Sequence, residues 1–331
     1  MRLSEIPLSV LDLAPVLQGG TAVDSLRRSL ELARYAERAG FHRYWVAEHH
    51  NMPGIASAAT SVVIGYLAAG TSRIRVGAGG VMLLNHAPLI IAEQFGTLAS
   101  LYPGRIDLGL GRAPGADQAT MRVLRQGLDA TGDDFPQQLE ELRSYLREPT
   151  PGQRIRAFPG AGTEVPIYLF GSGGFSAQLA GELGLPFASA GHFSPDNLLP
   201  GLEFYRSRFR PSETLPRPYA MVCVNIFAAD TDAEAESLAT SQYQAHLFLA
   251  RGMPVQLPPP KKSLAAVYAG PEQLPFLRGS IIGSAATVEE KLTALLEETQ
   301  ADELIIHSMI YDPDARQHSY EIVRDMAGIA V

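Results

Sequence analysis

Short apolar runs alternate with longer amphipathic segments along almost the whole chain. Runs typical of strands are predicted at 6–13, 42–48, 73–83, 105–111, 165–172, 186–190, 218–229 and 302–310. Helical spacing of apolar residues is found at 22–40, 57–70, 87–104, 135–148, 174–184, 195–209, 231–250, 288–299 and 314–328. In the first helix we predict Asp24 as the N-cap and Gly40 as the end.

About eight strand-then-helix units imply parallel pairing, because helix-length connections separate the strands. Eight such units fit a (β/α)8 TIM barrel better than an open sheet, and the 331 residues suit one domain over 1–331. One irregular region, 251–280, is rich in Pro and Gly and precedes the last βα unit. Loops this long are uncommon unless functional or mobile, so we predict an inserted, mobile active-site loop.

Composition excludes several classes of function. The net charge is −8, and no basic stripe with interleaved aromatic residues is present, so we expect no nucleic-acid partner. Cys223 is the only cysteine, which rules out an intrachain disulfide and predicts a small buried side chain. Neither a signal-peptide core nor an apolar window long enough for a bilayer is found, so we expect a cytoplasmic protein without a membrane partner.

Histidines gather where predicted strands end. Those that follow strands are His49, His50, His86, His192 and His307; those that fall elsewhere are His42, His246 and His318. The active site of such a barrel lies at the C-terminal ends of its strands, so the first five should share one face. A single histidine is more often structural than catalytic, and only the clustering favours a site.

A metal centre is the first alternative, because Glu48, His49 and His50 are acceptable Zn or Fe ligands. Adjacent strand residues point to opposite sides, however, so Glu48 and His49 would not share an ion. The residues after the first strand also lack the His-x-His of metal-dependent hydrolase barrels. We therefore predict no metal.

Two glycine-rich stretches suggest an anion site. "GLGRAPG" (109–115) closes the fourth strand and carries Arg112, and "FGSGGFSAQLA" (170–180) runs from a strand into a helix. Amide groups at such a helix start bind anions, Ser172 and Ser176 could add hydroxyls, and Arg112 could add a charge-assisted contact. The alternative is that these glycines only make tight turns. A dinucleotide fingerprint is disfavoured, because the spacing is G-x-G-x-x-x-G after the fourth strand.

Gly79 and Gly80 lie inside the predicted strand "RIRVGAGGVML". Glycines there weaken a strand and usually mark a bulge or a close approach of another group. We therefore expect something flat to pack against the barrel interior at this point.

At this stage four stretches resemble a known family. "WVAEHHN", "RIRVGAGGVML", "GRIDLGLGRAPG" and "LFGSGGFSAQLAGELGLPFA", in this order and spacing, are similar to bacterial luciferase-like flavin monooxygenases. The resemblance extends from about residue 6 to 328. It implies a TIM barrel with an insertion, often dimeric, that binds FMN or a deazaflavin at its C-terminal face.

The resemblance also implies residue roles. His49 would be the base near the flavin, Gly79-Gly80 would form a non-proline cis peptide against the flavin ring, and Arg112 would bind the flavin phosphate. The phosphate-side turn is Gly171, Ser172 and Gly173. The residues expected to contact substrate or to orient other groups are Glu48, His50, Asn51 and His192. Gly111 and Gly171 replace a cysteine and a glutamate of luciferase, which argues against light emission.

The leading interpretation is therefore an FMN-dependent, two-component monooxygenase. A separate NAD(P)H-dependent flavin reductase would supply reduced FMN, and the barrel would use O2 to oxygenate a small organic substrate while the loop excludes water. One alternative is a deazaflavin (F420)-dependent oxidoreductase, which the acidic chain disfavours. Another is a non-catalytic flavin-binding protein. An aldehyde, a sulfonate and a hydrocarbon all remain open as substrates.

Overall fold

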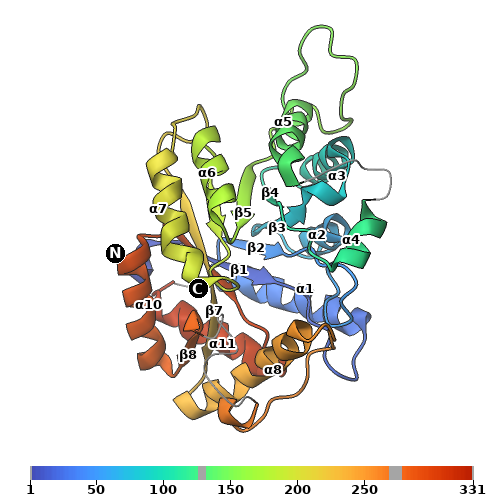
Figure 1. The fold of residues 1–331 in the computed structure, drawn as a ribbon. Coiled ribbons are helices and arrows are strands. Elements are labelled where there is room, and N and C mark those ends of the chain that lie inside the picture. The colour runs from blue at the N-terminus through green and yellow to red at the C-terminus, as the bar shows by residue number, and fades with distance from the viewer. Residues whose placement is uncertain (1, 126–131, 268–277, 330–331) are drawn as a thin grey trace.

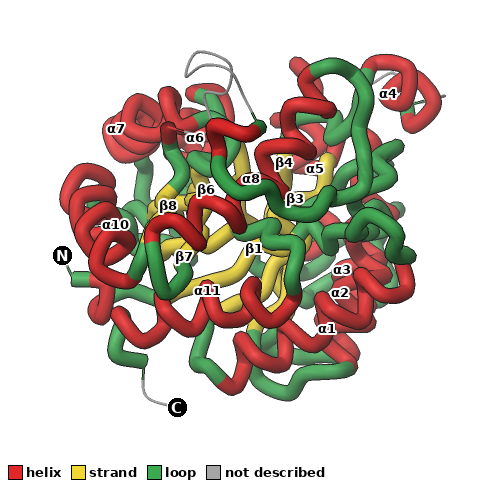
Figure 2. Tube along the Cα trace, turned by 90° about the horizontal axis from the view of Figure 1, so that it is seen from below, coloured by secondary structure: helices red, strands yellow, loops and turns green. Residues whose placement is uncertain are grey.

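Strands form the centre of the molecule and helices surround them (Figures 1 and 2). The structure, a computed structural model, describes residues 2–125, 132–267 and 278–329. The strands are β1 Leu8–Asp12, β2 Arg43–Val46, β3 Arg75–Met82, β4 Ile106–Gly111, β5 Ile167–Gly171, β6 Phe187–Ser189, β7 Ala220–Ala228, β8 Ile281–Gly283 and β9 Glu303–His307. The α-helices are α1 Ala22–Arg38, α2 Thr60–Ala69, α3 Pro88–Leu101, α4 Gln118–Leu124, α5 Phe135–Leu146, α6 Gly174–Leu183, α7 Leu198–Arg208, α8 Asp232–Ala250, α10 Ala285–Thr299 and α11 Pro313–Met326.

Strands β1 to β7 and β9 close into a barrel, which confirms the predicted TIM barrel. Neighbours pair in parallel in the order β6-β5-β4-β3-β2-β1-β9-β7, and β6 pairs with β7 to complete the ring. Every predicted strand is present, with ends shifted by a few residues. The sequence did not predict α4 or the short β8, which pairs with the end of β7 outside the ring. The insertion lies between α8 and α10, as expected.

The start of α1 corrects one prediction. Thr21, not Asp24, is the N-cap, and Asp24 occupies the third helical position. The Thr21 hydroxyl accepts a hydrogen bond from the Asp24 amide at 3.2 Å, while the Asp24 carboxylate accepts from the Thr21 amide at 3.0 Å. This is a capping box, in which each residue satisfies the other's free amide.

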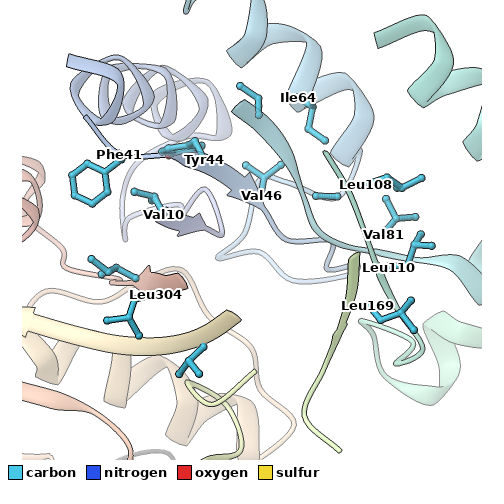
Figure 3. Close-up of a cluster of buried hydrophobic side chains, with 14 of the residues drawn as sticks. Val10, Phe41, Tyr44, Val46, Ile64, Val81, Leu108, Leu110, Leu169 and Leu304 are labelled. Carbon is cyan, nitrogen blue, oxygen red and sulfur yellow. The ribbon is translucent and has the colours of Figure 1, made fainter. Parts of the chain in front are cut away.

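Alternation along the strands creates two apolar layers. Tyr44 and Val46 of β2 point outward into the layer between barrel and helices, whereas Trp45 and Ala47 point into the barrel. Figure 3 shows part of the outer layer, including Val10 and Leu304 from neighbouring strands. Cys223 lies in the inner layer and is fully buried, as predicted. Residues beyond the strand ends continue this alternation, which decides where the side chains after β2 point.

A buried charge network fills the N-terminal end of the barrel interior. Arg43 of β2 donates two hydrogen bonds to Glu303 at 2.8 and 3.0 Å and one to Asp107 at 2.8 Å. It also donates to the Tyr168 hydroxyl at 2.9 Å. Arg75 binds the second oxygen of Asp107. The network joins five strands, β2, β3, β4, β5 and β9, and leaves each of these charges with a partner.

The Gly79-Gly80 peptide is cis, as predicted. The register between β3 and β4 shifts between Ala78 and Val81, so this is also the expected irregularity in the ladder. The close neighbours are protein atoms. A Cβ on Gly79 would approach Leu11 and Trp45, and one on Gly80 would approach the Gly109 backbone. The chain's own packing therefore requires glycine here, without reference to a ligand.

The inserted segment is partly outside the described residues, since the prediction covers 251–280 and 268–277 are not described. Its described beginning packs against the barrel mouth. The Leu257 amide donates to the Val16 carbonyl at 2.8 Å, the Gln18 amide donates to the Leu257 carbonyl at 2.8 Å, and Leu257 is fully buried. Residues 254–257 are thus anchored. Within the described ranges, no helix is long and apolar enough to cross a membrane.

Candidate functional site

A pocket opens at the C-terminal ends of the barrel strands, where the sequence predicted a site. It contains about 700 Å³ of space, open solvent at its mouth included. Its lining residues are Leu13, His49, Met52, Gly54, Ile55, His192, Phe193, Ala245, His246, Leu249, Pro254, Val255, Leu257, His307 and Met309. They come from the loops after β1, β2 and β6, from the end of β9 and the loop that follows it, from α8 and from the insertion.

His49 points into this pocket because the alternation of β2 continues past its end. Its Nδ1 is buried and has no hydrogen-bond partner within the part of the chain that the structure describes. Burial lowers the pKa of His49 to about 4, although the Glu48 carboxylate and the Gly115 backbone partly oppose the shift. The imidazole is therefore neutral at pH 7. An unperturbed histidine has a pKa near 6.5, and the desolvated position of His49 explains the difference.

Three further histidines line the same pocket. The His192 and His307 rings lie 5.2 Å apart between centroids in an edge-on arrangement. Burial lowers the pKa of His192 well below its usual value and that of His307 to about 3. His246, on α8, also lines the pocket, and burial lowers its pKa.

His246 corrects the sequence analysis, which placed it away from the site. Helix α8 leads from β7 into the insertion, and its last turns reach the pocket. In the sequence, the only indication that His246 reaches the site is the length of this predicted helix next to the long insertion.

Glu48, His50 and His86 form a separate cluster on the other side of the chain from His49. One carboxylate oxygen of Glu48 lies 2.8 Å from Nε2 of His50 and 2.8 Å from Nε2 of His86. The other oxygen accepts a hydrogen bond from the Met82 amide at 3.1 Å. Glu48 is buried, and these bonds together lower its pKa to about 2 despite desolvation. The five strand-end histidines thus form two groups and do not share one site.

This cluster bears on the metal question. Ligand atoms of Glu48, His50 and His86 all lie within 4.8 Å of one another, and such a set could hold a metal ion. The prediction of no metal rested on the opposite directions of Glu48 and His49, which do not apply to this combination. In the structure the three side chains satisfy one another by hydrogen bonds. They join the end of β2 to the loop that follows β3.

Asn51 connects the β2 loop to the β4 loop. It adopts a left-handed backbone conformation with φ of 55°, which asparagine tolerates better than most residues. Its side-chain amide donates to the Asp117 carboxylate at 3.2 Å, and the His50 amide donates to the Gly115 carbonyl at 2.9 Å. Asn51 is exposed, so it supports the loops and does not line the pocket.

Arg112 lies beside the start of α6. Its guanidinium carbon is 4.1 Å from the centroid of the Phe175 ring, in the first turn of that helix. Gly173 is the N-cap and supplies no side-chain hydrogen bond, so the first amides of α6 keep their donors. Ideal Cβ positions on Gly173 and Gly174 meet nothing within 4 Å. Ser172 is half-buried in the same turn, and the Ser176 hydroxyl lies beside Gly171.

The buried histidines predict a pH-dependent stability. His307 has a pKa of about 3 in the folded protein and about 6.5 in the unfolded chain, so the unfolded chain binds more protons between these values. The contribution of His307 to the free energy of unfolding is fully present above about pH 6.5 and is lost as the pH drops toward 3. At pH 5 the loss for this group is up to about 2 kcal/mol. In urea unfolding at pH 7 and pH 5, His307→Gln should show a smaller difference than the natural protein.

A matched control is available in His318. Its exposed ring bonds Asp230, which raises its pKa, so its contribution has the opposite sign and is lost as the pH rises. His318→Gln should leave the acid-induced loss intact or slightly larger. An unchanged pH difference in His307→Gln would contradict the assignment of that loss to His307.

With this geometry established, comparison with known proteins identifies the family: residues 7–328 match the luciferase-like monooxygenases, and the chain belongs to that family. It is 52% identical over 324 residues to a luciferase-like monooxygenase of Escherichia coli K12, covering 97% of each chain. It is 33% identical to the N-acetyl-S-alkylcysteine monooxygenase of Bacillus subtilis, covering 97% of this chain and 98% of the other. The protein is thus an oxidoreductase of the luciferase-like class.

Solved structures agree with the fold. The crystal structure of apo-MsnO8 superposes with a TM-score of 0.89 at 36% identity and covers 98% of this chain and 99% of its own. More distant neighbours include the FMN-bound oxygenating constituent of 3,6-diketocamphane monooxygenase, with 21% identity, and an F420-dependent secondary alcohol dehydrogenase, with 16% identity. At these identities the likeness concerns the fold alone; one of these neighbours is in complex with FMN and the other depends on F420.

Proposed function

We propose that the protein is an FMN-dependent monooxygenase that obtains reduced FMN from a separate NAD(P)H-dependent flavin reductase. The observation that carries the proposal is the juxtaposition of two sites at one end of the barrel. One is a pocket with the Nδ1 atoms of His49 and His192, which have no hydrogen-bond partner among the described residues, and the other is a candidate anion site at Arg112 and the start of α6.

The residues at the anion site fit a flavin phosphate. Helix α6 has ten residues and free amide donors at its N-terminus, where the helix dipole favours negative charge. Arg112 is exposed and already positioned by stacking on Phe175, so it can contact a phosphate without rearranging the fold. Gly171, Ser172 and Gly173 would make the turn that surrounds the phosphate. The half-buried hydroxyl of Ser172 would add one donor.

When bound, a reduced flavin would supply the reaction with O2. The oxygen atom transferred to the substrate would come from that O2. The role of the protein is to orient the reactants, to exclude water and to move a proton. His49 presents a neutral imidazole to the pocket, and we assign it the role of general base. Glu48 and His50 hold the backbone on either side of His49. Residues 254–257 cover the mouth, and the wider 251–280 segment would limit the access of water.

The deciding experiment for this proposal is oxidation of reduced FMN in the presence of a panel of small organic compounds. We expect an oxygenated product in place of free hydrogen peroxide for at least one compound. The name of the Bacillus relative specifies a thioether that carries a carboxylate, so thioethers belong in the panel. Activity with F420 alone, without oxygen consumption, would favour the alternative of a hydride-transferring oxidoreductase. The reductase and its flavin would share the cytoplasm with this enzyme.

Replacing Arg112 should discriminate between flavins with and without a phosphate. Arg112→Ala removes a charged hydrogen-bond donor, so FMN affinity should fall by about 1.5–3 kcal/mol, while riboflavin affinity changes little. Fluorescence quenching titrations with both ligands measure the difference. Arg122→Ala, which alters an arginine of the nearby α4, serves as the control. Equal weakening of FMN and riboflavin by Arg112→Ala would show that Arg112 does not touch the phosphate.

We further propose a homodimer formed through α2 and α3. These neighbouring helices expose apolar side chains that a monomer leaves in water: Val62 and Tyr66 on α2, and Ile90 and Leu101 on α3. Light scattering should give twice the mass of 35.7 kDa, and Val62→Glu combined with Leu101→Glu should give a folded monomer. Leu249→Glu, on α8, is the control and should leave the mass unchanged. A monomeric natural protein at micromolar concentration would contradict this proposal.

A further inference from the structure

The pocket beside His49 is mostly apolar, and its chemistry bears on the class of substrate. Apolar side chains line most of its surface, among them Leu13, Met52, Ile55, Leu257 and Met309. Several come from segments locked to one another. The Val16 amide donates to the Gly54 carbonyl at 2.9 Å, and the Leu257 amide donates to the Val16 carbonyl at 2.8 Å. The wall is therefore built from three anchored stretches of chain.

The described lining of the pocket offers no positive charge to a ligand. Among the described residues that line it, none is Lys, Arg, Asp or Glu. The sequence of 268–277, "YAGPEQLPFL", contains no Lys or Arg. The polar side chains among the described lining residues are four imidazoles, and burial favours the neutral form of each. His192 and His307 are 5.2 Å apart, so a proton on one would disfavour a proton on the other.

The pocket nevertheless contains hydrogen-bonding atoms that need a partner. Nδ1 of His49 and Nδ1 of His192 are buried and have no hydrogen-bond partner among the described residues. Buried polar atoms are almost always hydrogen-bonded in native proteins, so such exceptions require an explanation. A bound molecule with a carbonyl, amide or hydroxyl group would supply the partner for at least one of them.

Building on the proposed monooxygenase function, we infer that this pocket takes an uncharged, largely apolar small molecule with one hydrogen-bonding group, and that it discriminates against carboxylates and sulfonates. An anion here would lose its hydration without gaining a cationic partner, which is strongly unfavourable. Of the substrates that the sequence left open, this disfavours a sulfonate and favours an aldehyde or another neutral carbonyl compound over a plain hydrocarbon.

Matched pairs of ligands that differ in charge test the inference. We would measure binding by calorimetry at pH 7.5, with and without FMN, for octanamide against octanoate and for N-acetyl-S-benzylcysteine amide against N-acetyl-S-benzylcysteine, with octane-1-sulfonate as a further anion. The neutral member of each pair should bind at least about tenfold more tightly, a factor that corresponds to about 1.4 kcal/mol. Octanoate binding as tightly as octanamide, or no binding of either neutral compound, would overturn the inference.

A charge at the rim provides the converse test. Leu249 lines the pocket and is 37% exposed, so a lysine fits there with its ammonium group near the mouth. Leu249→Lys should bring octanoate to within a few-fold of octanamide, whereas Leu249→Met, the matched control, should keep the natural preference. An unaltered preference in the lysine variant would count against the electrostatic explanation. Because these are binding measurements, neutral-selective binding without turnover would refute the proposed monooxygenase function alone.

Discussion

His49→Ala should lower coupled oxygenation by about 10²–10⁴, the range typical of a lost general acid–base group. The ring is the imidazole of the β2 loop that faces the pocket, and its buried Nδ1 has no partner in the described ranges. Flavin affinity should stay within a few-fold, because the proposed phosphate site at Arg112 is separate. Single-turnover product yield per reduced FMN, together with a flavin titration, measures both quantities.

His50→Ala is the matched control for His49→Ala. His50 is adjacent in sequence but bonds Glu48 on the other side of the chain, so its loss should reduce turnover less. Because the pKa of His49 is about 4, the pH profile of the natural enzyme should stay flat for this group between pH 6 and 8. Full product formation by His49→Ala, still coupled to oxygen use, would remove His49 from the mechanism and leave it a binding role.

Arg43→Met should destabilise the fold by about 3–5 kcal/mol, because removing one partner of a buried ion pair leaves a charge uncompensated. Arg43 is 3% exposed and is shared between Glu303 and Asp107. Asp107 would keep Arg75, but of its described partners Glu303 would keep only the neutral hydroxyls of Ser9 and Tyr219. Urea unfolding at pH 7 measures the loss.

The exposed pair Arg278–Asp196 is the reference for Arg43→Met. Its charged groups are 2.8 Å apart, yet both side chains are more than half exposed. Exposed pairs contribute about 0–1 kcal/mol, so Arg278→Met should be nearly neutral. If Arg43→Met lost less than about 1 kcal/mol, the barrel network would be no more important to stability than such a surface pair.

The barrel was predictable because the sequence pattern that specifies it is local. Alternation of apolar runs with helical segments needs only neighbouring residues, and so does the position of His49 past the end of a strand. The cis peptide at Gly79-Gly80 followed from the family resemblance. The reason for glycine there did not, since the contacts with Leu11 and Gly109 come from other strands.

Features that depend on chain closure were missed. Arg43 looks like an ordinary charge at the start of a strand, and its partner Glu303 is 260 positions away. His246 belongs to a helix, and only the path of α8 across the mouth brings it to the pocket. The separation of His50 from His49 follows from the two-residue alternation past the end of β2, whereas the contact of His86 with Glu48 depends on the loop after β3.

The two sides of the β2 loop can evolve at different rates. Glu48 and His50 hold the backbone through hydrogen bonds that involve no pocket atom. These bonds thereby fix the position of His49, which lies between them. Residues such as Ile55, Leu249 and Met309 form the wall and take no part in that attachment. Exchanging them would alter which molecule enters without disturbing the proton-handling group. One scaffold can thereby acquire new substrates through few mutations, each of which leaves the chemistry intact.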